Sequence, residues 1–118
     1  MNAIREALVA IESILLGGGV VMPVITIDNS NCDPKKDHDI IMMVPSQSSL
    51  KSAIYKAKKY IENDLSHIDR DRIALLYDAF VTINGGDKFQ AIIVEREHKK
   101  YYQLHDNGSF INELVKMK

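Results

Sequence analysis

Apolar residues recur at helical spacing in two stretches of the chain. The first stretch, Ala3–Leu16, has a stripe of residues three or four positions apart, formed by Ile4, Leu8, Ile11 and Leu15. This spacing predicts an amphipathic helix, and the three glycines at 17–19 end it. The second stripe predicts a longer helix over Ser49–Ser66 and consists of Leu50, Ile54, Ala57, Ile61 and Leu65. Serines at 46, 48 and 49 offer N-cap oxygens for this helix.

Short runs rich in β-branched residues predict five strands. These are Val20–Ile27, Ile40–Val44, Arg72–Ile83, Lys88–Glu97 and Tyr101–Leu104. Pro23 lacks a backbone donor, which points to an edge strand or a bulge for the first of them. The sequence Asn-Gly-Gly-Asp at 84–87 predicts a hairpin between the third and fourth strands, because these residues tolerate the positive φ of tight turns. We expect Lys99 and Lys100 to form the next turn.

A last short apolar stripe predicts a final helix after the turn at residues 106–108, carrying Phe110, Ile111, Leu114 and Val115. The predicted order is α-β-β-α-β-β-β-α, which favours a single α+β domain over residues 1–118 with a mainly antiparallel, five-stranded sheet. Both faces of Arg72–Ile83 are apolar, so we expect this strand in the centre of the sheet. One helix cannot cover both faces of this sheet. A terminal helix or a second subunit must therefore cover the other face.

Composition limits the function classes. Of the 118 residues, 46% are apolar and 26% charged, as in an ordinary globular domain. A net charge of −1 argues against binding to nucleic acid or to a membrane surface, both of which need a basic excess. No apolar run approaches the length of about 20 residues that a membrane span needs. A single cysteine, Cys32, is consistent with the reducing cytoplasm.

Asp78 is the residue that folding alone explains least, because it lies within an otherwise apolar strand. If Gly85 and Gly86 are the turn residues, Asp78 pairs with Ile93 and lies diagonal to Glu95, about 7–8 Å away. Paired carboxylates can divide the roles of acid and base. If residues 84 and 85 form the turn, the two carboxylates separate. In the alternative structural interpretation, Asp78 binds a backbone amide or an arginine such as Arg72 or Arg96.

The polar segment Asp28–Asp39 contains further candidate groups. Cys32 is a free thiol without a local catalytic signature. The cluster of Asp33, Asp37, His38 and Asp39 has oxygen and imidazole ligands that could hold a hard cation, but its spacing does not match an EF-hand, which favours a solvated loop. The histidines never fall three or four positions apart on one helix, and His98 and His105 are interpreted as surface residues. The sequence therefore predicts no catalytic motif, no metal site and no cofactor.

The segment LLYDAFVTINGGDKFQAIIVEREH resembles a family of small uncharacterised bacterial proteins. That family has a V-Y-D strand, a polar turn, a strand of pattern D-A-I-x-V-E-x-E-H and an aromatic closing strand. Gln90 stands where its members have Asp. The matching residues are Leu76, Tyr77, Asp78, Val81, Ala91, Ile92, Val94, Glu95, Glu97 and His98. The resemblance implies a bacterial protein and this α+β fold, and it brings no established activity.

Two functions remain open at this stage. The first is a non-catalytic protein-binding module of the cytoplasm, comparable in size to immunity proteins or secretion chaperones, with Tyr101 and Tyr102 as exposed contact residues. Homodimerisation through the sheet belongs to this hypothesis. The second is a small enzyme or ligand-binding domain that uses Tyr77, Asp78 and Glu95 in a pocket between helix and sheet.

Overall fold

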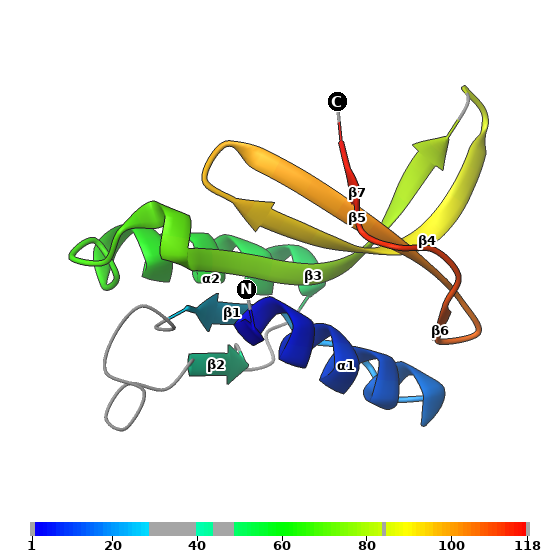
Figure 1. The fold of residues 1–118 in the computed structure, drawn as a ribbon, viewed down its shortest axis with the longest axis horizontal. Coiled ribbons are helices and arrows are strands. Elements are labelled where there is room, and N and C mark those ends of the chain that lie inside the picture. The colour runs from blue at the N-terminus through cyan, green and yellow to red at the C-terminus, as the bar shows by residue number, and fades with distance from the viewer. Residues whose placement is uncertain (1, 29–39, 44–48, 84, 118) are drawn as a thin grey trace.

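A computed structural model describes residues 2–28, 40–43, 49–83 and 85–117. Within these ranges the chain forms two α-helices, a short 3₁₀ turn and seven strands in one sheet (Figure 1). The elements are α1 (Asn2–Leu16), β1 (Val24–Ile27), β2 (Ile40–Met43), α2 (Leu50–Asn63), η1 (Arg70–Arg72), β3 (Ile73–Ile83), β4 (Asp87–Arg96), β5 (Lys99–Asp106), β6 (Ser109–Phe110) and β7 (Val115–Lys116). The sheet order is β2-β1-β3-β4-β5-β6, and β7 also pairs with β5. Every pairing is antiparallel, so the predicted α+β class is confirmed.

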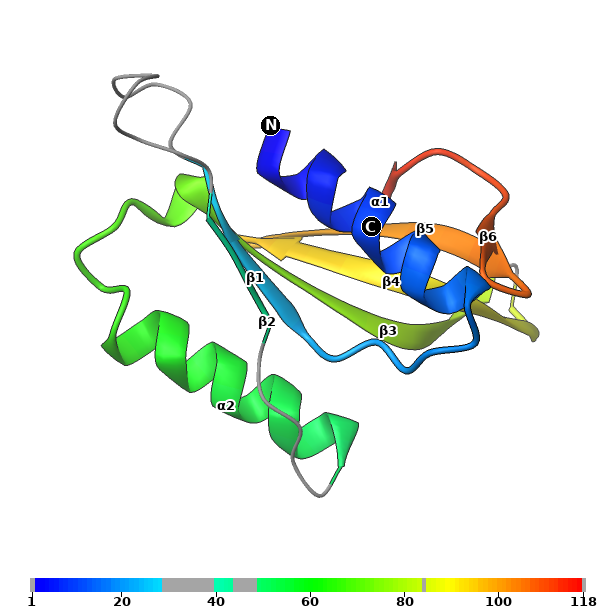
Figure 2. The same cartoon turned by 90° about the horizontal axis from the view of Figure 1, so that it is seen from below.

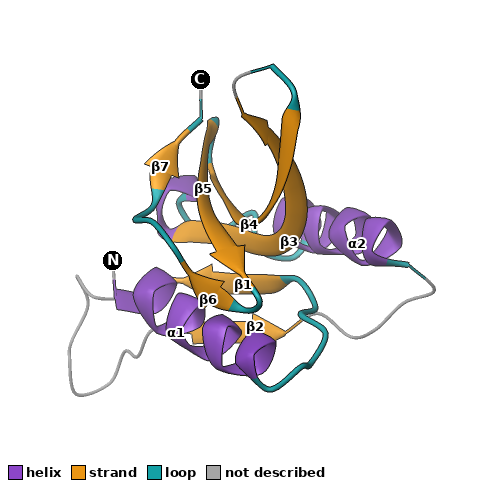
Figure 3. Cartoon of the chain, turned by 90° about the vertical axis from the view of Figure 1, so that its right-hand side faces the viewer, coloured by secondary structure: helices purple, strands orange, loops and turns teal. Residues whose placement is uncertain are grey.

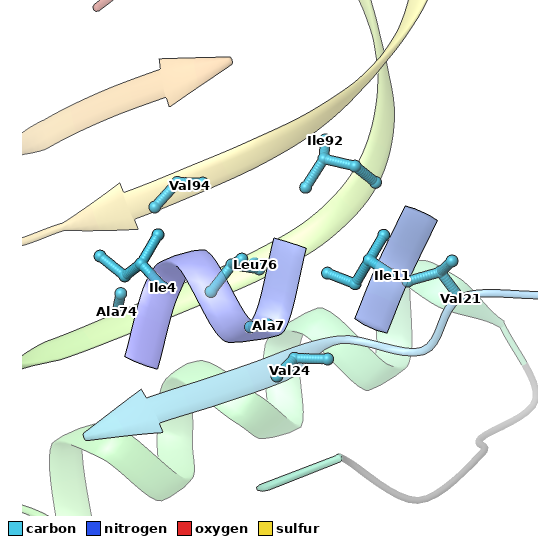
Figure 4. Close-up of a cluster of buried hydrophobic side chains, with 9 residues drawn as sticks. All are labelled: Ile4, Ala7, Ile11, Val21, Val24, Ala74, Leu76, Ile92 and Val94. Atoms are coloured by element: carbon cyan, nitrogen blue, oxygen red, sulfur yellow. The ribbon is translucent and has the colours of Figure 1, made fainter. Parts of the chain in front are cut away.

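The two helices cover opposite faces of the sheet (Figure 2). We call these the α1 face and the α2 face. On the α1 face, the helix places Ile4, Ala7 and Ile11 against a buried cluster from the strands and the segment before β1 (Figure 4). That cluster contains Val21, Val24, Ala74, Leu76, Ile92 and Val94. On the α2 face, a second cluster joins Ala57 and Ile61 of α2 to Ile25, Ile27, Ile73 and Leu75. The N-terminal helix therefore provides the cover that the sequence required.

β3 lies in the interior of the sheet between β1 and β4, as predicted. Its first four residues, Ile73–Leu76, are buried on both faces. The predicted hairpin with β4 is also confirmed. The two strands close at Ile83 opposite Asp87, which leaves the three residues 84–86 for the turn. Neither of the expected two-residue turns gives this register. Gly85 has φ +82°, the conformation that favours glycine.

The final helix predicted around Phe110–Val115 is wrong. This stretch forms the short strands β6 and β7, both paired with β5. The segment between them is held by Asn112, whose side-chain oxygen accepts from the Leu104 amide at 2.7 Å. Gln103 also donates to the Asn112 carbonyl at 2.8 Å. So short a helix would be marginal, whereas pairing with β5 satisfies the backbone directly.

Other predicted boundaries need smaller corrections. The chain turns at Glu97 and His98, with Glu97 at φ 56°, and β5 already begins at Lys99. β1 begins after Pro23, so this proline limits the strand without placing it at the sheet edge, which β2 occupies. Ser49 is the N-cap of α2 and accepts from the Ser52 amide at 3.1 Å. The side chains of 29–39, including Cys32, Asp33 and His38, lie outside the described residues.

The β3–β4 hairpin is longer than its neighbours. β1 pairs with β3 only along Ile73–Leu76, and β5 pairs with β4 only along Ala91–Arg96. The part of the hairpin beyond these pairings, Tyr77–Ile83 and Asp87–Gln90, projects as a twisted arm (Figure 3). We call it the distal arm.

Candidate functional site

A groove of about 620 Å³ opens between the distal arm and the strands β5 and β7. One wall is β3, which contributes nearly every residue from Tyr77 to Ile83. The opposite wall is the chain end around β7, with Val115, Lys116 and Met117. In Figure 1, the two strands that supply these walls, β3 with its arrow and the red β7, both lie in the upper part of the view. We call it the β3–β7 groove.

The groove exists because α2 covers only part of its face. The cluster beneath α2 reaches along β3 as far as Leu75, with Tyr77 at its margin. Beyond that point a separate cluster of Val81, Ala91 and Ile93 lies between β3, β4 and β5. Its partly buried neighbours include Tyr102, Leu104 and Met117, and no helix contributes to it among the described residues. An apolar surface of the sheet is therefore left open to solvent.

The lining is mainly apolar, with two cations. Its non-aromatic apolar residues are Ala79, Val81, Ile83, Ile93, Val115 and Met117, and its aromatic residues are Tyr77, Phe80 and Tyr102. Lys100 and Lys116 line the groove, and no described aspartate or glutamate does; Lys100 is paired with Glu95 outside the lining, so Lys116 supplies the unpaired charge among the described residues. Such a surface suits an apolar ligand that also carries an acidic group.

Glu95 lies at one end of β4, on the α2 face. Its carboxylate is between Lys58 of α2 and Lys100 of β5, with both Nζ atoms 3.4 Å from a carboxylate oxygen. The Tyr77 side chain, diagonal to it across the hairpin, forms a hydrogen bond to the same carboxylate. Burial raises the pKa of Tyr77 far above its usual value, and the charge of Glu95 and this hydrogen bond raise it further. Tyr77 is thus an un-ionised donor at neutral pH.

Asp78 lies on the other face of the sheet. It pairs with Ile92 and not with Ile93, while Glu95 pairs with Leu75. A shift of one residue in register exchanges the two faces of a strand, so the side chains of Asp78 and Glu95 point to opposite sides. The carboxylate pair that the sequence suggested is not formed. The enzyme hypothesis loses the geometry on which it depended.

The partner of Asp78 is His105, which no motif had indicated. The Nε2 atom of His105 lies 3.1 Å from Oδ1 of Asp78. His105 is 5% exposed, so its interpretation as a surface residue is wrong. Its Nδ1 atom is buried without a hydrogen-bond partner among the described residues. Asp78 therefore has a structural partner, although this partner is a histidine and not Arg72 or Arg96.

A smaller pocket of about 220 Å³ does lie between α2 and the sheet. Glu95 lines it, together with Lys58 and Glu62 of α2 and Arg70 of η1, but Tyr77 and Asp78 do not. Of the three residues expected in a helix–sheet pocket, the structure therefore places one there. Tyr77 lines the β3–β7 groove instead.

The two neighbouring tyrosines of β5 also separate. Tyr101 pairs with Val94 and packs on the α1-face cluster, whereas Tyr102 pairs with Ile93 and lines the β3–β7 groove. Both are half-buried and not exposed. The sequence pattern did not identify Val115 and Met117 as site residues, because it assigned their segment to a helix. The alternation of side chains along β5 was the sequence signal that Tyr101 and Tyr102 lie on opposite faces of the sheet.

The described residues hold neither a metal-binding cluster nor a membrane-spanning helix. They contain no group of three or more histidine, cysteine, aspartate or glutamate side chains placed to hold a metal ion. None of the helices in the described ranges is long and apolar enough to cross a membrane.

Comparison with known proteins gave no match to a family model, to a curated protein or to a solved structure. The resemblance in the β3–β4 segment therefore stays a prediction. The fold and the β3–β7 groove are the basis for any assignment of function.

Proposed function

We propose that this chain is a small non-catalytic protein-binding module, comparable to an immunity protein or a secretion chaperone, and that the β3–β7 groove is its binding surface. The observation that supports this function is the groove itself, an apolar surface of the sheet that neither helix covers. Its aromatic and methionine side chains belong to the residue types that interfaces favour. The single cysteine favours a partner in a reducing compartment.

The apolar surface is costly to leave in water. Val115 is 38% and Phe80 67% exposed, and both line the groove. Contiguous apolar patches on monomeric proteins mark interaction sites more often than isolated apolar residues do. A partner that covers the groove would remove these side chains from water and gain the corresponding hydrophobic free energy.

The test uses two matched valine variants in an affinity capture from the source cells. Val115→Asp places a charge in the groove, and Val9→Asp places the same charge on the exposed side of α1, where Val9 is 69% exposed. We expect a partner that wild type and Val9→Asp retain and Val115→Asp loses. With the purified partner, Val115→Asp should weaken binding at least about tenfold.

Both variants must first show the unfolding midpoint of the wild type, so that a loss of binding is not a loss of fold. A partner that Val115→Asp still binds would place the interface elsewhere. Loss by both variants, or the absence of any enriched partner, would contradict the proposed function. A second copy of the chain as the captured species would show a homodimer.

A further inference from the structure

Among the described strands, none lies beside the outer edge of β3 along the distal arm. Its pairing with β1 ends at Leu76, and from Tyr77 to Ile83 it pairs with β4 alone. Among the described residues, no backbone hydrogen bond joins this edge to any other segment. Alternate residues of an antiparallel strand point their N–H and C=O groups to each side, so a row of donors and acceptors faces outward here.

This edge borders the β3–β7 groove. Six of the seven residues from Tyr77 to Ile83 line the groove, and they include residues from both faces of the strand, such as Phe80 and Val81. If the groove lay over one face of the strand alone, only every second residue of β3 would line it. An occupant of the groove would therefore lie beside the outward N–H and C=O groups of β3, with β7 on its other side.

The charged side chains that line the groove favour some occupants over others. Lys100 and Lys116 line it and no described carboxylate does, although the chain as a whole is nearly neutral. Lys100 already pairs with Glu95, whereas Lys116 forms no ion pair among the described residues, so a carboxylate on the occupant would complement Lys116. A second copy offers none from the matching strand, because the only acidic residue between Tyr77 and Ile83 is Asp78, which is bound to His105.

We propose that the β3–β7 groove binds an extended polypeptide segment that adds to the free edge of β3. The segment carries apolar side chains at alternate positions, which enter the groove, and an acidic side chain or carboxyl terminus that faces Lys116. Backbone hydrogen bonds provide affinity in this mode, and the alternate side chains provide specificity. This inference rests on the proposed function and names the chemistry of the partner.

The first experiment selects ligands from a randomised library of peptides of about nine residues, long enough to pair with the edge. The full chain is the target, and Lys116→Glu and Lys51→Glu are parallel targets. Lys51 is an exposed lysine of α2 outside the groove. We expect wild type and Lys51→Glu to select alternating apolar sequences with Asp or Glu, and Lys116→Glu to lose the acidic preference. No enrichment, or enrichment without acidic residues, would overturn the proposal.

The second experiment tests the backbone. The best synthetic peptide is compared with a version N-methylated at alternate residues, made in both possible phases. One phase should lose at least about tenfold in affinity and the other should keep it, because only one set of amides faces β3. Equal binding by both would show that side chains alone hold the peptide.

Amide exchange locates the contact. Bound peptide should slow exchange at alternate residues of Tyr77–Ile83 and leave α2 unchanged. If the amides of this edge exchange slowly without peptide and light scattering gives twice the mass of one chain, a second copy of the chain covers the edge. If the Val115→Asp test identifies a partner and the peptide tests fail, the proposed function stands and the strand addition does not.

Discussion

Gly108 lies where the turn before β6 approaches the end of α1. Its φ is +89°, and a Cβ atom there would lie 2.7 Å from the carbonyl carbon of Leu15 and 2.8 Å from its oxygen. Side chains other than hydrogen are therefore excluded by both conformation and space. This glycine allows the last part of the sheet to pack on the first helix.

Gly108→Ala should destabilise the protein more than Gly85→Ala. Both glycines have positive φ, which costs alanine roughly 1–2 kcal/mol. A Cβ at Gly85 meets nothing within 4 Å, so the difference between the two variants measures the clash with Leu15. We expect it to add about 1–3 kcal/mol in denaturant unfolding. Equal losses would show that the backbone relaxes around the new methyl group.

Tyr77 makes the stability of the folded protein depend on pH in the alkaline range. Its pKa is raised in the folded state, so the un-ionised phenol stabilises the fold fully below the unfolded value of about 10. That contribution is lost as the pH rises above this value toward the folded pKa. The unfolding free energy of the wild type minus that of Tyr77→Phe should therefore be constant below about pH 10 and decrease above it.

The measurement combines unfolding curves with phenolate absorbance. While both proteins remain folded, the wild-type spectrum minus that of Tyr77→Phe should show no phenolate signal near pH 10. A normal ionisation in this difference spectrum would contradict the buried hydrogen bond to Glu95.

At the scale of elements, the carboxylate of one residue in α1 forms a hydrogen bond to β6. Oε2 of Glu12 accepts from the backbone amide of Phe110 at 2.8 Å. Glu12→Ala leaves that amide without its partner, and should cost about 1–3 kcal/mol. Glu6→Ala, on an exposed position of the same helix, should change stability by less than about 0.5 kcal/mol. Comparable losses for both variants would mean that helix propensity, and not the bond to β6, determines the effect.

The elements also show what the sequence could and could not predict. Both helices follow from their apolar stripes, and the hairpin follows from the glycines at 85 and 86. The spacing of Phe110 and Leu114 also fits a helical stripe, but β5 offers free backbone partners that a sequence pattern does not reveal. Local periodicity therefore failed where pairing with a distant strand decided the structure.

The candidate site depended on the register, which local sequence could not determine. Residues 84–86 allow a turn of two or three residues, and the length of the turn determines which side chains of β4 lie on each face of the sheet. The three-residue turn places Asp78 and Glu95 on opposite faces and Tyr77 on the same face as Glu95. The β3–β7 groove was not predictable, because its walls come from two segments far apart in the sequence, residues 77–83 and 115–117, that meet only in the sheet.

At the scale of the whole molecule, stability should be distributed unevenly along β3. Residues Ile73–Leu76 lie between two strands and beneath both helices, whereas the distal arm has one strand neighbour and no helix over it among the described residues. We expect slow amide exchange at every position of the first part. In the distal arm, exchange should alternate between slow and fast residues.

This pattern can be measured by NMR on the free protein, without a ligand. Proton exchange at Leu75 and Leu76 should approach the rate set by global unfolding. Uniform protection from Tyr77 to Ile83 would show that the outer edge is already covered in the free protein. Uniformly fast exchange there would show that the arm opens as a unit.

The bond between Glu12 and Phe110 joins residues 98 positions apart. The apolar stripe of α1 likewise packs on Ile92 and Val94, far along the chain. On the ribosome, α1 emerges before these partners and must wait, at about 5–20 residues per second, for them to be translated. For those seconds α1 carries an exposed apolar stripe, so this helix needs chaperone protection until its partner strands are made.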